Sequence, residues 1–96
     1  MQKTNVIQTL MQHKSKLAQQ FGVSRLALFG STVRNTVTEV SDVDILISFD
    51  GVVTSQRYFG VQFYLEDLLG CPVDLVSEKA LRAELRPYIE SEAIDV

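Results

Sequence analysis

GSTVRNTVTEVSDVD, residues 30–44, lies between two short apolar runs, Leu26–Phe29 and Ile45–Ile47. Each run has the composition of a buried strand. Gly30 can take a positive φ at no steric cost, so the chain can turn sharply and a ligand can approach its backbone. Ser31 is suited to the N-cap of a short following helix, whose free N–H groups would bind phosphate. The alternative for these two residues alone is a capped turn without a ligand.

Two carboxylates, Asp42 and Asp44, close this stretch at the start of the second strand. Side chains alternate across a strand, so both carboxylates project from the same face. Their mutual repulsion costs roughly 4 kcal/mol at about 4 Å and an effective dielectric of about 20. A divalent cation offsets this repulsion, and Mg²⁺ takes one or two carboxylates together with water and phosphate oxygens. The alternative is a solvated turn at Ser41 before an ordinary strand.

A third acid, Asp74, lies in Pro72–Val76, an apolar run that also predicts a strand. If this strand pairs beside the one that begins near Asp42, about 4.8 Å away, Asp74 reaches the same point as Asp42 and Asp44. Three carboxylates beside a phosphate-binding turn are typical of a two-metal site for phosphoryl or nucleotidyl transfer. The sequence therefore predicts such a site beside Gly30.

These motifs resemble the signature of the DNA polymerase beta-like nucleotidyltransferase superfamily. The matching segments, in order, are Gly30-Ser31-x-x-Arg34, Ser41-Asp42-x-Asp44 and Val73-Asp74-Leu75. Within the superfamily the chain is similar to the minimal nucleotidyltransferases, which include the MntA-type antitoxins encoded with HEPN toxins. The similarity extends from about Ile7 to Ile94. Asn35 departs from the pattern, because relatives often carry glycine there, and this concerns only the local loop conformation.

The resemblance implies a catalytic and metal-binding role for three acids: Asp42, Asp44 and Asp74. It implies nucleotide binding by four residues: Gly30, Ser31, Arg34 and Ser41. The metal would be Mg²⁺ in a two-metal site and the substrate ATP. The reaction would add AMP to a hydroxyl, a tyrosine, of a HEPN ribonuclease toxin, which would make the chain a type VII antitoxin. Arg34 would either neutralise the triphosphate or pair with an acidic neighbour.

Two other functions stay open. The chain could neutralise its partner by binding alone, through an aromatic arc on the helix expected at 55–69. It could also modify a small molecule together with a separate substrate-binding subunit. Because 96 residues leave no room for an acceptor domain, each of these functions requires a partner, and we expect a hetero-oligomer.

Composition limits the class of protein. Apolar residues make up 46% and charged residues 22%, as in an ordinary globular protein. The length predicts one domain, residues 1–96. No apolar run approaches the ~20 residues of a membrane span, and a lone cysteine, Cys71, suits a small buried residue in a cytoplasmic protein. The net charge of −3 argues against direct nucleic-acid binding, although residues 1–35 carry five Lys or Arg and no acid.

The pattern along the chain predicts an α/β (α+β) fold, a small mixed sheet flanked by helices in the order α-β-α-β-α-β-α. Helices are expected at 4–20 and 55–69, with the aromatic residues of the second in the core. A further helix is expected after Ser77, ended or kinked by Pro87. His13 is expected at the surface, and the tail, through Ile94 and Val96, is expected to fold back.

Overall fold

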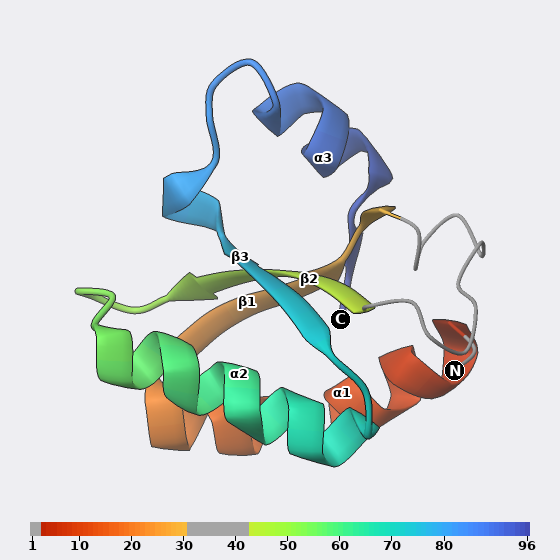
Figure 1. Ribbon diagram of the computed structural model, residues 1–96, viewed down its shortest axis with the longest axis vertical. Helices are drawn as coiled ribbons and strands as arrows, with labels where there is room; N and C mark the ends of the chain where they lie inside the picture. Colours follow the sequence, from red (N-terminus) through yellow and green to blue (C-terminus); the bar gives the residue numbers. More distant parts are fainter. Residues whose placement is uncertain (1–2, 31–42) are drawn as a thin grey trace.

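A four-stranded mixed sheet organises the computed structural model, which describes residues 3–30 and 43–96 (Figure 1). The strands are β1 (Val23–Leu28), β2 (Val43–Phe49), β3 (Val73–Ser77) and β4 (Ile94–Asp95), arranged β3-β2-β1-β4. β2 pairs antiparallel with β1 and parallel with β3, and β4 pairs antiparallel with β1. The predicted fold class is therefore confirmed, with β4 as an additional edge strand.

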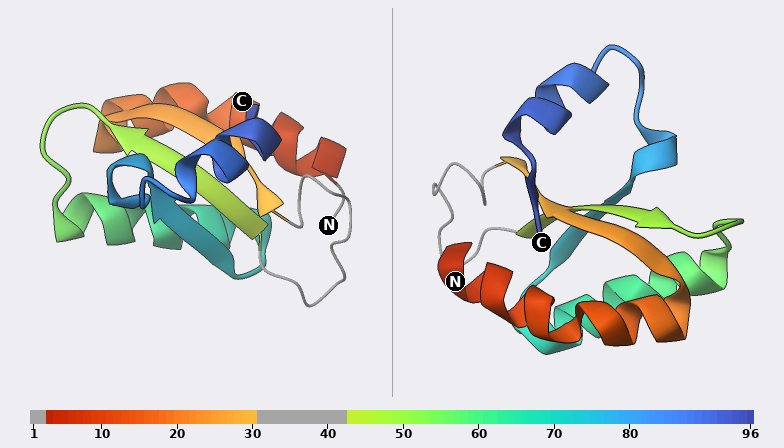
Figure 2. Two further views of the ribbon diagram at one scale, coloured as in Figure 1. Left: turned by 90° about the horizontal axis from the view of Figure 1, so that it is seen from above. Right: turned by 180° about the vertical axis from the view of Figure 1, so that it is seen from behind.

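The helices lie on both faces of the sheet. α1 (Lys3–Phe21) and α2 (Ser55–Leu69) lie side by side on one face. η2 (Glu78–Ala80), a single 3-10 turn, and α3 (Arg86–Glu92) lie on the other (Figures 1 and 2). Thr54 caps α2 by accepting a hydrogen bond from the Arg57 N–H. Both long helices thus lie within a residue or two of the predicted positions.

Alternation along β2 separates the two faces. Val43, Ile45 and Ile47 belong to the core beneath α1 and α2. Asp44 and Leu46 lie between them in sequence, so their side chains point to the opposite face. Leu46 is nevertheless fully buried, which confirms that the apolar centre of this strand is covered on both sides. In the part of the chain that the structure describes, no helix is long and apolar enough to cross a membrane.

α1 and α2 approach closely where α2 carries a glycine. A Cβ placed on Gly60 would lie 2.6 Å from the ring of Phe21, so a larger side chain there would require this ring to shift. His13 lies in the same seam, half-buried, with its Nδ1 2.8 Å from the hydroxyl of Tyr64. His13, expected at the surface, is thus only partly exposed, because its ring nitrogen and the Tyr64 hydroxyl of the neighbouring helix form a hydrogen bond.

The expected long helix after Ser77 is wrong. The chain forms η2, leaves helical geometry, and starts α3 at Arg86, so Pro87 lies in the first turn of a helix rather than at its end. A proline in the first turn loses no hydrogen bond, because the early N–H groups of a helix have no partner within it. The tail folds back as predicted: Ile94 pairs with Leu28, and the Val96 N–H donates to the Leu26 carbonyl at 2.9 Å.

Side-chain exposure differs from expectation at three other positions. Phe59 and Phe63 were expected in the core but are 50% and 66% exposed. Both lie on the side of α2 that points away from the sheet, because Val61 and Leu65 occupy the inner side. Cys71, expected to be buried, is half-buried in the turn before β3.

Arg25 fastens the C-terminal segment to the sheet. Its Nε donates to Asp95 at 2.7 Å, and its guanidinium lies 3.0 Å from Glu90. The hydrogen bond to Asp95 raises the pKa of Arg25 further above its ordinary value, more than burial lowers it. Arg25 thus joins β1 to both α3 and β4.

Candidate active site

Asp44 and Asp74 occupy opposed positions on neighbouring strands. β2 and β3 run parallel, and Asp44 is the direct register partner of Asp74. Opposed residues of a parallel pair point to the same face, and the strands lie about 4.8 Å apart. Asp44 is half-buried and Asp74 is exposed. The structure therefore brings two of the three predicted acids together, on the face away from α1 and α2.

Gly30 lies against the Asp44 carboxylate. Its φ is +66°, a conformation that residues with a side chain rarely adopt. A Cβ built on Gly30 would lie 2.5 Å from Asp44 Oδ2, closer than atoms normally approach. The backbone before it is tied to the same residue, because the Phe29 N–H donates to the Asp44 carbonyl at 3.2 Å. The turn after β1 and the first carboxylate of β2 are thus one unit.

The outer edge of β3 is covered by side chains from α2. Val73 donates its N–H to Glu66 at 3.1 Å, and its carbonyl accepts from Gln62 at 3.5 Å. The Tyr58 hydroxyl donates to the Leu75 carbonyl. Tyr58, Gln62 and Glu66 follow one another every four residues and therefore lie in a row along one side of α2. These bonds hold the backbone on both sides of Asp74.

The Asp74 carboxylate influences Tyr58, the first residue of this row. Burial raises the pKa of the Tyr58 phenol above its ordinary value, and the nearby Asp74 carboxylate raises it further. Both effects disfavour the phenolate, because a second negative charge in a partly desolvated place is costly. Tyr58 is therefore a neutral hydrogen-bond donor next to the acid pair.

The Asp44–Asp74 pair has the chemistry of a Mg²⁺ site. Mg²⁺ binds through one or two carboxylates and completes its shell with water and phosphate oxygens, and two acids on adjacent strands fit this donor set. Within residues 3–30 and 43–96, no group of three or more possible ligands comes together. The third acid of the prediction, Asp42, lies outside these ranges.

Four predicted site residues lie outside the described part of the chain: Ser31, Arg34, Ser41 and Asp42. The short helix expected after Gly30 lies there too. Of the predicted residues that are described, Gly30, Asp44 and Asp74 form one cluster. His13 lies in the α1–α2 seam beneath the other face of the sheet, away from this cluster.

Sequence reasoning missed the row on α2. Tyr58 was interpreted as core packing, and Gln62 and Glu66 were given no role at the site. The spacing of three polar tips every four residues was visible, but its meaning depends on β3 lying alongside α2. The sequence alone does not set that distance.

Comparisons with known proteins identify the family. A family model described as a nucleotidyltransferase domain matches residues 10–96. Over 87 residues the chain is 38% identical to the protein adenylyltransferase MntA of Thermococcus cleftensis, a match that covers 91% of this chain and 88% of that protein.

Solved structures share the fold. A provisionally named minimal nucleotidyltransferase superposes with a TM-score of 0.85 at 32% identity, covering 100% of this chain and 97% of that one. A toxin–antitoxin structure with AMP-PNP gives a TM-score of 0.72 at 21% identity, covering 88% and 69% of the two chains. A chain from the complex of a tri-AMPylated Shewanella oneidensis HEPN toxin with MNT antitoxin gives a TM-score of 0.65 at 20% identity, covering 99% of this chain and 71% of that one. At these lower identities the likeness concerns the fold.

Proposed function

The chain belongs to the nucleotidyltransferase domain family, and on this premise we propose that it transfers AMP from ATP to a hydroxyl group of a partner protein. The observation that carries the proposal is the register pairing of Asp44 with Asp74, next to a glycine turn that contacts Asp44. A structural role gives no reason to place two carboxylates side by side, because they repel each other. A Mg²⁺ ion that serves phosphate transfer offsets this repulsion.

Each site residue would have a role that follows from its position. Asp42 and Asp44 would hold Mg²⁺, which supplies charge neutralisation for the triphosphate. Gly30 and Ser31 would bind phosphate oxygens, with Ser41 and Arg34 as further nucleotide contacts. Asp74 is more exposed than Asp44, so an acceptor would reach Asp74 more easily. It would act as the base and as a ligand for a second Mg²⁺.

The transfer step requires one general base. The acceptor oxygen forms a bond to the α-phosphorus while the bond from that phosphorus to the leaving pyrophosphate oxygen breaks. The electron pair leaves with pyrophosphate, and the acceptor proton passes to the Asp74 carboxylate. A general base within hydrogen-bond reach of the acceptor is the geometric requirement for this step.

We place the acceptor on a HEPN-family toxin, as a tyrosine hydroxyl, and the chain in the class of antitoxins. Support comes from the adenylyltransferase to which the chain is 38% identical and from the fold shared with the antitoxin bound to an AMPylated HEPN toxin. Adenylation of the toxin by its own antitoxin would silence it without degradation of either protein.

The test uses the chain co-purified with a HEPN-family protein as the candidate partner. With Mg²⁺ and ATP we expect pyrophosphate release and an intact mass of the partner increased by whole adenylate units. Asp44→Asn and Asp74→Asn should each lower the rate at least about a hundredfold, since stabilisation of phosphoryl charge is worth several kcal/mol. Asp50→Asn is the matched control, because Asp50 is exposed at the far end of β2. Full activity of either site variant would refute the proposal.

A second function is favoured by one observation. Phe59 and Phe63 are half or more exposed on the outer side of α2, where they could dock a partner and neutralise it without chemistry. Partner inhibition that survives Asp44→Asn but is lost in Phe63→Ser would favour this alternative over adenylate transfer.

A further inference from the structure

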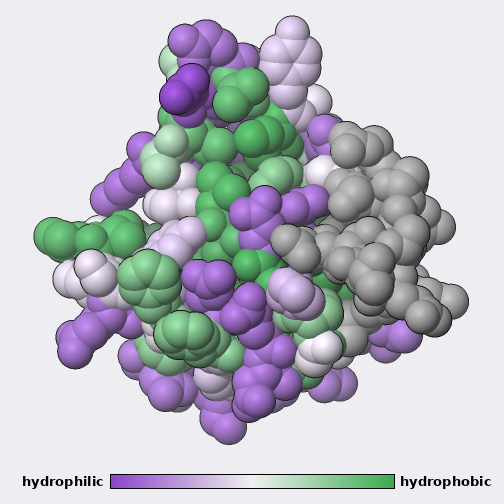
Figure 3. All heavy atoms as spheres, in the orientation of Figure 1, coloured by the Kyte–Doolittle hydropathy of each residue, from purple (hydrophilic) through white to green (hydrophobic). Residues whose placement is uncertain are grey.

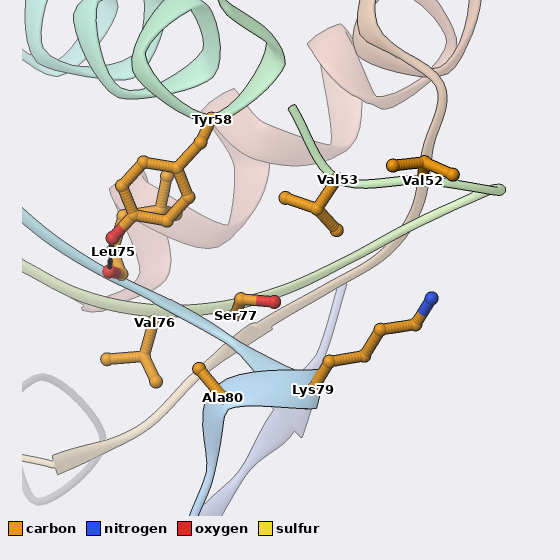
Figure 4. A pocket seen from close by; sticks show the side chains of 8 residues that line it. All are labelled: Val52, Val53, Tyr58, Leu75, Val76, Ser77, Lys79 and Ala80. Atoms are coloured by element: carbon orange, nitrogen blue, oxygen red, sulfur yellow. Dashed lines mark hydrogen bonds between the residues drawn. The ribbon is translucent and has the colours of Figure 1, made fainter. Parts of the chain in front are cut away.

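An open pocket of about 690 Å³ lies at the C-terminal end of β3. Its walls come from four places: the loop after β2 (Val52 and Val53), α2 (Tyr58), the strand itself (Leu75 and Val76), and η2 (Ala80) (Figure 4). The volume lies within the range in which proteins hold small ligands. On the face shown in Figure 3, apolar side chains also lie over this loop and over the segment that leads from η2 to α3.

The pocket and the acid pair share one strand. Val76 lines the pocket and lies two residues beyond Asp74, so its side chain points to the same face of the sheet. Two residues of strand correspond to about 7 Å, and three, as far as Ser77, to about 10 Å. Tyr58 connects the two places, because it lines the pocket while its hydroxyl donates to the carbonyl of Leu75, the residue that follows Asp74. A ligand anchored in the pocket would reach Asp74 with a short extension.

Among the residues that line the pocket, Lys79 carries a positive charge. Lys79 lines the pocket, is exposed, and donates to the Gly51 carbonyl at 3.3 Å. The loop does not depend on this bond alone, since Arg57 donates to the Asp50 and Val52 carbonyls at 2.8 and 2.9 Å. The Lys79 ammonium can therefore turn to an anionic ligand without releasing the loop. An occupant with an apolar body and an adjacent carboxylate matches this arrangement.

Strand addition does not explain the pocket. A peptide that extended the sheet would need the outward backbone groups of β3, but α2 already occupies the Val73 N–H, the Val73 carbonyl and the Leu75 carbonyl. Recognition at this edge must therefore proceed through side chains placed in the pocket.

We propose that the pocket is the acceptor subsite: it holds a bulky apolar side chain of the acceptor segment, with a neighbouring carboxylate on Lys79. The hydroxyl residue to be modified then lies about three residues away in an extended segment and reaches Asp74. This inference rests on the proposed function for the identity of the occupant. The pocket would therefore select acceptor segments in which an apolar residue next to an acidic residue lies about three positions from the modified hydroxyl.

A peptide titration without ATP tests the binding claim by itself. The probes are acetylated, amidated peptides of the order Tyr-Ser-Ser-Leu-Glu and the reverse, each compared with its Leu-to-Ser counterpart. We expect one order to shift the amide NMR signals of Val76, Ser77 and Ala80. Its Ser counterpart should bind about tenfold more weakly, the loss of one buried leucine side chain. The proposal would be overturned if the Leu and Ser peptides of each order bound with equal affinity, or if no peptide bound. It would also be overturned if ATP displaced the peptide and shifted the signals of the same amides.

Two matched variants test the consequence for transfer. Ala80 and Ala83 are both exposed on the same segment, but only Ala80 lines the pocket. The HEPN partner is added at increasing concentration to each variant of the chain. Ala80→Glu should raise the KM for this acceptor about tenfold, because the new carboxylate fills the pocket and repels the carboxylate of the acceptor. Ala83→Glu should leave the KM unchanged. Equal acceptor KM values in both variants would contradict the inference. If the wild-type chain transfers no adenylate, the proposed function fails, while the peptide titration still decides the pocket.

Discussion

Gly30 is the residue on which the position of the Asp44 carboxylate depends most directly. Its φ of +66° turns the chain away from β1, and the missing side chain leaves room for Asp44 Oδ2. Gly51 offers a natural comparison. Its φ is +76°, but a Cβ built there meets nothing within 4 Å. The two glycines therefore separate backbone strain from contact with the acid.

The first prediction compares alanine at these two positions. Gly51→Ala should lower the free energy of unfolding by about 1–2 kcal/mol, the cost of a side chain in the left-handed region, and leave transfer unchanged. Gly30→Ala should cost at least as much and also displace the Asp44 carboxylate, so that adenylate transfer falls sharply. Chemical denaturation and the transfer assay measure the two effects. Equal activity in both variants would mean that the Gly30–Asp44 contact has no part in the reaction.

At the scale of elements, Glu78 binds the C-terminal segment to the sheet. Its carboxylate accepts from the Ser48 hydroxyl, lies 3.3 Å from Arg86 and 3.6 Å from Arg25. The hydrogen bond from Ser48, and then the two guanidinium groups, lower the pKa of Glu78 below 4.5 against the opposing effect of burial. Together with Arg25, Glu78 fixes η2 and α3 over the face that carries the acids.

A pH dependence of stability follows. Because the folded-state pKa of Glu78 is lowered, its contribution is complete above the unfolded-state value near 4.5 and is lost as the pH falls through the lower folded-state value. Between pH 7 and pH 3 the wild-type chain should therefore lose more thermal stability than Glu78→Gln. Glu84→Gln, exposed on the same segment, is the control and should behave as the wild type. An identical pH profile for all three would exclude this role of Glu78.

The sequence predicts elements where local signals agree and fails where contacts between elements decide. The predicted bounds of α2 hold, since Thr54 caps its start and Gly70 ends it in the left-handed conformation. Alternation turns Asp44 and Asp74 away from the apolar residues beside them, and the parallel register of β2 and β3 then brings the two acids to one face. The helix after Ser77 is wrong because Pro87 suits the start of a helix as well as its end. Phe59 and Phe63 are misplaced because their side of α2 is exposed, which composition does not reveal.

At the scale of the whole molecule, the sheet divides stability from function. One face packs on α1 and α2 and contains the core of Leu10, Ile45 and Leu65. The other face carries Asp44 and Asp74, and η2 and α3 lie on that side of the sheet (Figure 1). Asp44→Asn and Asp74→Asn change residues outside this core and should therefore remain folded, which makes it possible to separate loss of activity from loss of structure.

The most direct measurement is paramagnetic broadening by Mn²⁺, added with a non-transferable ATP analogue. At the lowest Mn²⁺ concentrations, the amide signals of Gly30, Asp44 and Asp74 should broaden first, and the double variant Asp44→Asn/Asp74→Asn should abolish the effect. Broadening that begins instead at acids of the C-terminal segment, such as Glu84, or that persists in the double variant, would contradict a cation and nucleotide site at this acid pair.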